Sequence, residues 1–138
     1  MYRCRLNVIS SYEIKTGIKR ELEKKFSKLS SVLGLKGEVN LVIVDPRTCQ
    51  RLNKTYRKKS YVPDVLAFRY REPTLIGEIV INGEIVINIH DKKKQELDFN
   101  FLHRLFIHGL VHLAGYDHEK SRYQEKVFNN LEKKLLSI

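Results

Sequence analysis

The sequence predicts an α+β fold, a small mixed sheet of four strands covered by helices, in one domain spanning residues 1–138. Two periodic patterns lead to this class. Apolar residues recur at three- and four-residue steps in long segments, and short segments rich in Val and Ile lie between them. The chain has no linker or low-complexity stretch, and 138 residues suit a single hydrophobic core.

The first third of the chain is expected to form a strand, a helix and a second strand. Residues 3–9 are predicted to form a short strand, and residues 38–44 a buried one. Between them, residues 15–35 have helical periodicity, and Gly34 and Gly37 favour a helix end there. The inward positions of this helix are Ile18, Leu22, Phe26, Leu29 and Leu33.

A short second helix is predicted over residues 47–56. Asp45 is a good N-cap residue, and Pro46 suits the first helical position. Residues 57–60 should form a basic turn, and residues 64–70 a third strand.

The sequence GEIVIN occurs twice in succession, at residues 77–82 and 83–88. Because Asn-Gly is favoured in tight turns, we expect two strand segments joined by a hairpin at Asn82 and Gly83.

Two helices are expected to complete the order β-α-β-α-β-β-α-α. Asp91 can cap a long third helix, whose apolar positions recur from Leu97 and which ends at Gly115. The last helix should span residues 120–136, with Glu119 placed to cap it.

The charge of the chain favours a polyanionic partner, above all nucleic acid. Lys and Arg number 26 against 16 acidic residues, a net charge of +10, although a basic protein without such a partner has the same composition. The apolar runs are too short to cross a bilayer, and the first residues lack the pattern of a signal peptide. Cys4 and Cys49 are isolated, which suits a reducing cytosol, so we expect a cytoplasmic protein that does not contact membranes.

Residues 108–118, HGLVHLAGYDH, have the histidine spacing of a zinc-peptidase helix. His108 and His112 lie four residues apart, so both rings project from one helix face. Gly115 can take the left-handed conformation that reverses the chain and brings back His118. Three imidazoles leave one tetrahedral position open, as catalytic zinc sites do. We predict one transition-metal ion per chain, zinc by default, although imidazole also suits nickel and other divalent ions.

Other polar residues near this motif also have simpler interpretations. Asp117 can accept a hydrogen bond either from a metal-binding histidine or from its own turn backbone, and both alternatives stay open. His90 and His103 fall outside the spacing and are interpreted as ordinary surface or core histidines.

Gly109 occupies the position at which such a peptidase carries its catalytic glutamate. Amide hydrolysis requires a proton for the leaving amine, whereas phosphodiester cleavage requires that charge on phosphate oxygens be neutralised. A three-histidine site without this glutamate, on a basic chain, therefore favours phosphodiesters over peptides.

Three blocks of the sequence resemble the YbeY family, bacterial metal-dependent endoribonucleases associated with ribosomal RNA maturation. HGLVHLAGYDH resembles the family signature H-G-x-x-H-L-x-G-Y-D-H. LNKTYRKKSYVPDVLAF, residues 52–68, is similar to L-N-x-x-Y-R-x-K-D-K-P-T-D-V-L-S-F, and GEIVI, residues 77–81, is similar to G-D-I-V-I. The resemblance implies a small sheet packed with helices, with the three histidines as metal ligands.

The resemblance also implies that Arg57 is the catalytic cation. A guanidinium can bind a phosphate bidentately and stays charged. Asp64 matches the family's aspartate and is expected in the cleft. Lys58 and Lys59 either attract the RNA backbone or are merely solvated. The family's Thr before Asp64, its Ser before Phe68 and the Asp of its G-D strand are here Pro63, Ala67 and Glu78.

The leading hypothesis is a single catalytic domain that cleaves single-stranded RNA. The resemblance places its action in ribosomal RNA maturation and ribosome quality control, with ribosomal RNA or ribosomal particles as partners. Two alternatives remain. One is a zinc metallopeptidase, and the other is a non-catalytic RNA-binding ribosome-assembly factor whose metal is structural.

Overall fold

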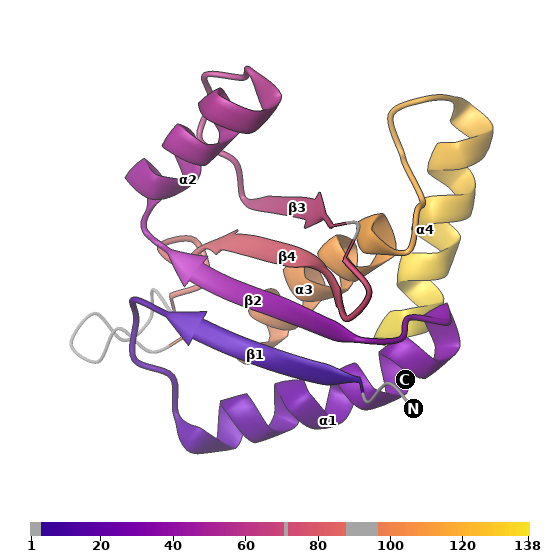
Figure 1. Cartoon of the computed structure of the whole chain (residues 1–138), viewed down its shortest axis with the longest axis horizontal. Coiled ribbons are helices and arrows are strands. Elements are labelled where there is room, and N and C mark those ends of the chain that lie inside the picture. Colours follow the sequence, from indigo (N-terminus) through magenta and orange to yellow (C-terminus); the bar gives the residue numbers. More distant parts are fainter. Residues whose placement is uncertain (1–3, 71, 88–96) are drawn as a thin grey trace.

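A mixed four-stranded sheet forms the centre of the computed structural model, which describes residues 4–70, 72–87 and 97–138. The strands lie in the order β1-β2-β4-β3 (Figure 1). Their bounds are β1 Arg5–Ser10, β2 Glu38–Val44, β3 Val65–Arg69 and β4 Leu75–Asn82. The pairs β1/β2 and β2/β4 are parallel, whereas β3 is antiparallel to β4. The predicted four-stranded mixed sheet is therefore confirmed, with β1 and β3 at its edges.

Helix α1 (Thr16–Leu33) is the crossover that makes β1 and β2 parallel. Three of its apolar residues, Leu22, Phe26 and Leu29, are almost fully buried, as the helical spacing predicts. The helix ends at Gly34, whose left-handed backbone, φ 69°, directs its N–H to the last carbonyls of the helix.

Helix α3 (Phe99–Leu113) lies behind the sheet in Figure 1, on the same face as α1, and α4 (Arg122–Leu136) packs against it. The ring of Phe106 on α3 lies 6.3 Å from the ring of Phe26 on α1. Helix α3 also approaches β4 closely. A Cβ atom on Gly109 would stand 2.6 Å from Cγ2 of Ile79, so no larger residue fits there without displacement.

The opposite face of the sheet is covered by α2 (Pro46–Leu52) and by the π-helical turn η1 (Asn53–Arg57) that follows it. A small second core lies beneath them, formed by Cys49, Leu66 and Val80. The Asp45 side chain accepts a hydrogen bond from the Thr48 N–H, so the predicted cap is confirmed. The predicted helix over residues 47–56 is correct up to Leu52 and then widens into η1.

The predicted hairpin at Asn82 and Gly83 is wrong. Residues 83–86 form a turn, and Ile87 makes only an isolated bridge to Leu97; residue 88 lies outside the described residues. Strand β4 already has β2 on one edge and β3 on the other, so it has no free edge for another strand. The Asn82 side chain accepts the Glu84 N–H instead, which closes a tight turn.

Two predicted helix caps are also wrong. Helix α3 begins at Phe99, and its cap is Asp98, which accepts from the N–H groups of Asn100 and Phe101. The cap predicted for this helix, Asp91, lies outside the described residues, as does His90. Helix α4 is capped by Ser121 rather than by Glu119.

Within residues 4–70, 72–87 and 97–138, no helix combines the length and the apolar content that crossing a membrane requires.

Candidate metal centre and its cleft

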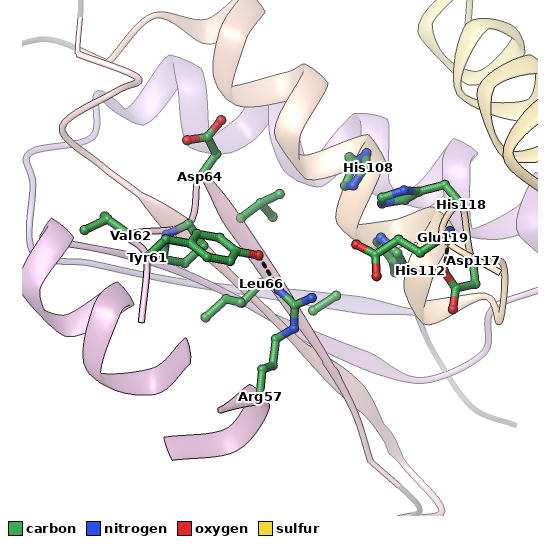
Figure 2. Close-up of a pocket in the computed structure, with 13 residues that line it drawn as sticks. Arg57, Tyr61, Val62, Asp64, Leu66, His108, His112, Asp117, His118 and Glu119 are labelled. Atoms are coloured by element: carbon green, nitrogen blue, oxygen red, sulfur yellow. Dashed lines mark hydrogen bonds between the residues drawn. The ribbon is translucent and has the colours of Figure 1, made fainter. Parts of the chain in front are cut away.

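Three histidine side chains meet at the C-terminal end of α3. His108 and His112 project from one face of the helix, and Gly115, with φ 99°, turns the chain so that His118 returns to them (Figure 2). One ring nitrogen of each histidine lies within 4.8 Å of the others, a spacing at which the three can hold a metal ion. The cluster therefore has the arrangement that the i, i+4 spacing and the glycine turn predict.

A carboxylate on α4 orients the first of these histidines. Oε2 of Glu132 lies 3.0 Å from Nδ1 of His108. When Nδ1 carries the proton and donates it to this carboxylate, the lone pair of Nε2 is free to bind a metal. Sequence reasoning missed Glu132, which stands 24 residues away. One signal was present: Glu132 is a charged residue at helical spacing from Phe128 and Leu135, which are buried.

The ring of Phe128, on α4, packs against the rings of all three histidines. The Phe128 ring centre lies 4.9 Å from the ring centres of His108 and His112 and 5.0 Å from that of His118. Burial, followed by the nearby His108 and His118, lowers the pKa of His112 to about 4. His112 is therefore neutral at pH 7, the form in which an imidazole binds metals.

Asp117 acts as a turn residue. Its carboxylate accepts the Glu119 N–H at 2.8 Å, and this hydrogen bond lowers the pKa of the carboxyl group. Within the described part of the chain, Asp117 has no hydrogen bond to a histidine. Of the two alternatives for Asp117, the structure supports the turn.

A cleft of about 540 Å³ separates the histidines from η1. Arg57 lines the cleft opposite the histidines, and its Nη1 atom lies 3.3 Å from the Tyr61 hydroxyl oxygen (Figure 2). Asp64 and Asp117 also line this cleft, as does Glu119. Sequence reasoning treated Glu119 only as a cap and missed it as a cleft residue.

Lys58 and Lys59 are exposed and do not belong to the described lining of the cleft. Lys58 ends η1 in a left-handed conformation, φ 56°, and its N–H donates to the Asn53 carbonyl. The two lysines therefore lie beside the cleft and do not form its wall.

Two side chains hold the loop that carries Tyr61. The Asn53 amide donates to the Tyr61 carbonyl at 2.9 Å, and the Gln50 amide donates to the Ser60 carbonyl at 2.9 Å. Asn53 is fully buried, so it anchors the loop from inside the fold. Sequence reasoning missed both anchors.

The packing of α3 explains why position 109 is glycine. This position faces β4 and contacts Ile79, whereas His108 and His112 face the cleft. A glutamate there would have to displace the sheet before its carboxylate could approach the histidines.

A family model described as Endoribonuclease YbeY matches residues 4–138. The chain belongs to the YbeY family. This confirms the resemblance seen in the three sequence blocks.

Individual YbeY relatives match most of the chain. A protein named Endoribonuclease YbeY from Aquifex aeolicus is 38% identical over 130 residues, which cover 89% of this chain and 85% of the relative. Another of that name, from Thermodesulfovibrio yellowstonii, is 34% identical over 120 residues, covering 83% and 75%. The solution structure of TM1509 from Thermotoga maritima superposes with a TM-score of 0.62 at 25% identity, covering 96% of this chain and 87% of that one.

Of the three residues that depart from the YbeY motifs, two line the cleft and one does not. Pro63 and Ala67 line the cleft between the histidines and η1, which we call the metal cleft. The hydroxyl groups that the motif would supply there are therefore missing. Glu78 lies away from this cleft, where it accepts hydrogen bonds from Asn40 and Tyr70. The Glu78 change therefore leaves the lining of the metal cleft untouched.

Proposed function

We propose that this chain is a metal-dependent endoribonuclease that cleaves single-stranded RNA in the cytoplasm, in the maturation and quality control of ribosomal RNA. One observation carries the proposal: three histidines that can share a metal face Arg57 across a single cleft, in a member of the YbeY family. The whole chain acts as one catalytic domain.

His108, His112 and His118 would hold one metal ion, for which zinc is the default. The residues fit such an ion, because His112 is neutral at pH 7 and Glu132 fixes the tautomer of His108. When bound, a divalent ion supplies a Lewis acid that offsets charge developing on the phosphate.

Arg57 is the group of this chain that binds the phosphate. Its guanidinium offers parallel N–H donors that match two phosphate oxygens, in the planar geometry that suits phosphate recognition. The Tyr61 hydroxyl lies 3.3 Å from Nη1 and limits where the guanidinium can point. Because Asn53 anchors the Tyr61 backbone, the buried amide indirectly positions Arg57.

A single strand suits this cleft better than a duplex does. The histidines are partly buried between α3, α4 and the loop after η1, so a flexible backbone can enter where a rigid double helix cannot. Lys58 and Lys59 stand beside the entrance and add attraction to the phosphates, so binding should weaken steeply with salt.

Neither rival function explains the site as well. A peptidase of the H-E-x-x-H kind needs a glutamate at position 109, where Ile79 leaves no room for one. A purely structural metal calls for a fourth protein ligand, and the cluster found in the described part of the chain contains three residues. An ion held by these three histidines would therefore keep a coordination position for a substrate.

The decisive experiment compares His112→Ala and Arg57→Ala with the wild type in cleavage of a labelled single-stranded RNA, with each protein loaded with zinc, nickel or manganese. Both variants should lose cleavage, and chelation should abolish it in the wild type. His103→Gln is a matched control, since His103 lies on α3 outside the cleft. Undiminished cleavage by both cleft variants would exclude this function, and turnover of casein with intact RNA would favour the peptidase.

A further inference from the structure

A second hollow, of about 470 Å³, lies beside β3 on the face of the sheet that α2 covers. Three aromatic side chains, Tyr56, Phe68 and Tyr70, line it. Glu78 and Arg69 add one carboxylate and one cation to the lining. The histidines of the metal centre are on the other face, so this hollow, which we call the aromatic pocket, is a separate site.

The rings of the aromatic pocket are held in place and yet remain accessible. Tyr56 is 67% exposed, while its ring meets that of Phe68 edge-on, with centres 5.5 Å apart and planes at 64°. The Tyr70 hydroxyl donates to Oε2 of Glu78 at 3.1 Å, and Asn40 donates to Oε1 of the same carboxylate at 3.2 Å. An exposed ring held at a fixed angle is a good platform for stacking a nucleobase.

The aromatic pocket adjoins the metal cleft at β3. Ala67 lines both hollows. Tyr56, which lines the aromatic pocket, is followed in the sequence by Arg57, which lines the metal cleft. Nη1 of Arg69 would lie 3.4 Å from a Cβ atom on Gly115, in the turn that carries His118. Among the described strands, none pairs with the outer edge of β3, so a polymer chain can cross there.

The charges around this edge suit a phosphate backbone. Residues 46–63, which include α2 and η1, contain no Asp or Glu. The charged side chains of this segment are all basic: Arg47, Arg51, Lys54, Arg57, Lys58 and Lys59. A strand of RNA that crosses from the cleft to the pocket would therefore pass a basic segment, although Asp64 lines the cleft and Glu78 lines the pocket.

We propose that the aromatic pocket binds one unpaired base of the same RNA strand whose phosphate lies in the metal cleft. The base stacks on Tyr56, and Glu78 accepts hydrogen bonds from N–H groups on the edge of the base. Arg69 neutralises a phosphate between the two sites. The inference rests on the proposed endoribonuclease function and adds to it a subsite that binds a base away from the scissile bond.

The test measures binding of a fluorescent single-stranded oligoribonucleotide to the metal-loaded protein by anisotropy on ice, with gels to show that the strand is intact. Tyr56→Leu should raise the Kd about 5- to 100-fold, the range expected for one lost stacking contact. Tyr56→Phe keeps the ring and should bind as the wild type does. Tyr123→Leu, which removes a 77% exposed tyrosine on α4, should also leave the Kd unchanged. The urea midpoint of each variant shows that it is folded.

A scan of abasic positions along the RNA tests whether one base is the ligand. In the wild type, one position should weaken binding more than its neighbours. With Tyr56→Leu, the strand lacking that base should bind no worse than the intact strand, because the partner is already missing. A uniform loss at all positions, or an equal loss with Tyr123→Leu, would overturn the subsite.

The outcomes separate this inference from the proposed function. If the wild type cleaves single-stranded RNA through His112 and Arg57 while Tyr56→Leu is indistinguishable from it, the subsite alone fails. If the wild type neither binds nor cleaves single-stranded RNA, both proposals fail. Binding of a labelled extended peptide along β3 that RNA does not displace would overturn the subsite in favour of a strand-pairing partner.

Discussion

Nδ1 of His108 lies 3.0 Å from Oε2 of Glu132, a polar contact that joins α3 to α4 at the metal centre. Carboxylates in this position fix the ring and raise its basicity toward a metal, and their loss typically weakens metal binding about 10- to 100-fold. We therefore expect Glu132→Ala to weaken zinc binding by this factor and Glu132→Gln to have an intermediate effect. Competition with a chromophoric chelator measures the affinity.

Glu125→Ala is the matched control for the Glu132 variants, since it removes an exposed glutamate from the same helix. It should bind zinc as tightly as the wild type does. Equal affinities for Glu132→Ala and the wild type would show that the contact does not tune the site.

The contact between Gly109 and Ile79 predicts a large effect from a single methyl group. Gly109→Ala would place Cβ 2.6 Å from Cγ2 of Ile79, and overpacking of this kind costs about 1–3 kcal/mol in the free energy of unfolding. Urea denaturation measures it. Gly17→Ala is the control, because a Cβ atom at Gly17 on α1 has no neighbour within 4 Å, and this variant should be at least as stable as the wild type.

Coupling between the two positions tests the cause of this loss. In the background Ile79→Ala, adding Gly109→Ala should cost much less than in the wild type, because the clashing atoms are gone. Strict additivity would mean that the loss arises elsewhere.

Local signals explain the parts of the site that were predictable. His108, His112 and His118 are fixed by helical spacing and one glycine turn, all within eleven residues, and Asp45 caps the helix directly after it. Such features depend on neighbours along the chain, which the sequence displays.

Contacts between distant segments explain what was missed. Glu132 reaches His108 only because α4 packs against α3, and Asn53 reaches Tyr61 only because η1 folds back on its own loop. The hairpin at Asn82 was predicted from a favourable dipeptide, but the order of strands left β4 without a free edge. Periodicity identified the strands and could not tell which of them would be neighbours.

The two cysteines should react very differently with thiol reagents. Burial, assisted by the nearby Asp45 carboxylate, raises the pKa of Cys49 to about 11, so only about one molecule in a thousand carries this thiolate at pH 8. Cys4 is exposed. At pH 8 the native protein should therefore release one equivalent of chromophore from a disulfide reagent, and the protein in urea two. Fast release of two equivalents from the folded protein would contradict the burial of Cys49.

The same raised pKa predicts a loss of stability in alkali. The folded state holds the Cys49 proton more tightly than the unfolded state, so its contribution is intact below the ordinary thiol pKa and is lost as the pH rises toward about 11. Cys49→Ser is a poor test because it buries a hydroxyl, so Cys49→Ala is preferred. This variant should be less stable than the wild type at neutral pH, with a smaller further loss in alkali.

His103 should make the protein sensitive to acid. Burial, and then the nearby Lys25, lowers the pKa of His103, and its Nε2 atom has no hydrogen-bond partner in the described structure. The unfolded state therefore binds this proton more readily than the folded state. The stability that His103 contributes is present above about pH 6.5 and is lost as the pH falls through its lowered folded-state value.

Replacing His103 by leucine should reduce this sensitivity. His103→Leu removes the titrating group and its unpaired nitrogen while keeping an apolar side chain against Phe99, on which the imidazole now stacks. In metal-free protein, the urea midpoint should fall less between about pH 7.5 and about pH 5 for this variant than for the wild type. His112, whose pKa is also low, titrates in both proteins, so the difference between them isolates His103. Parallel losses in the two proteins would place the acid sensitivity at the metal histidines instead.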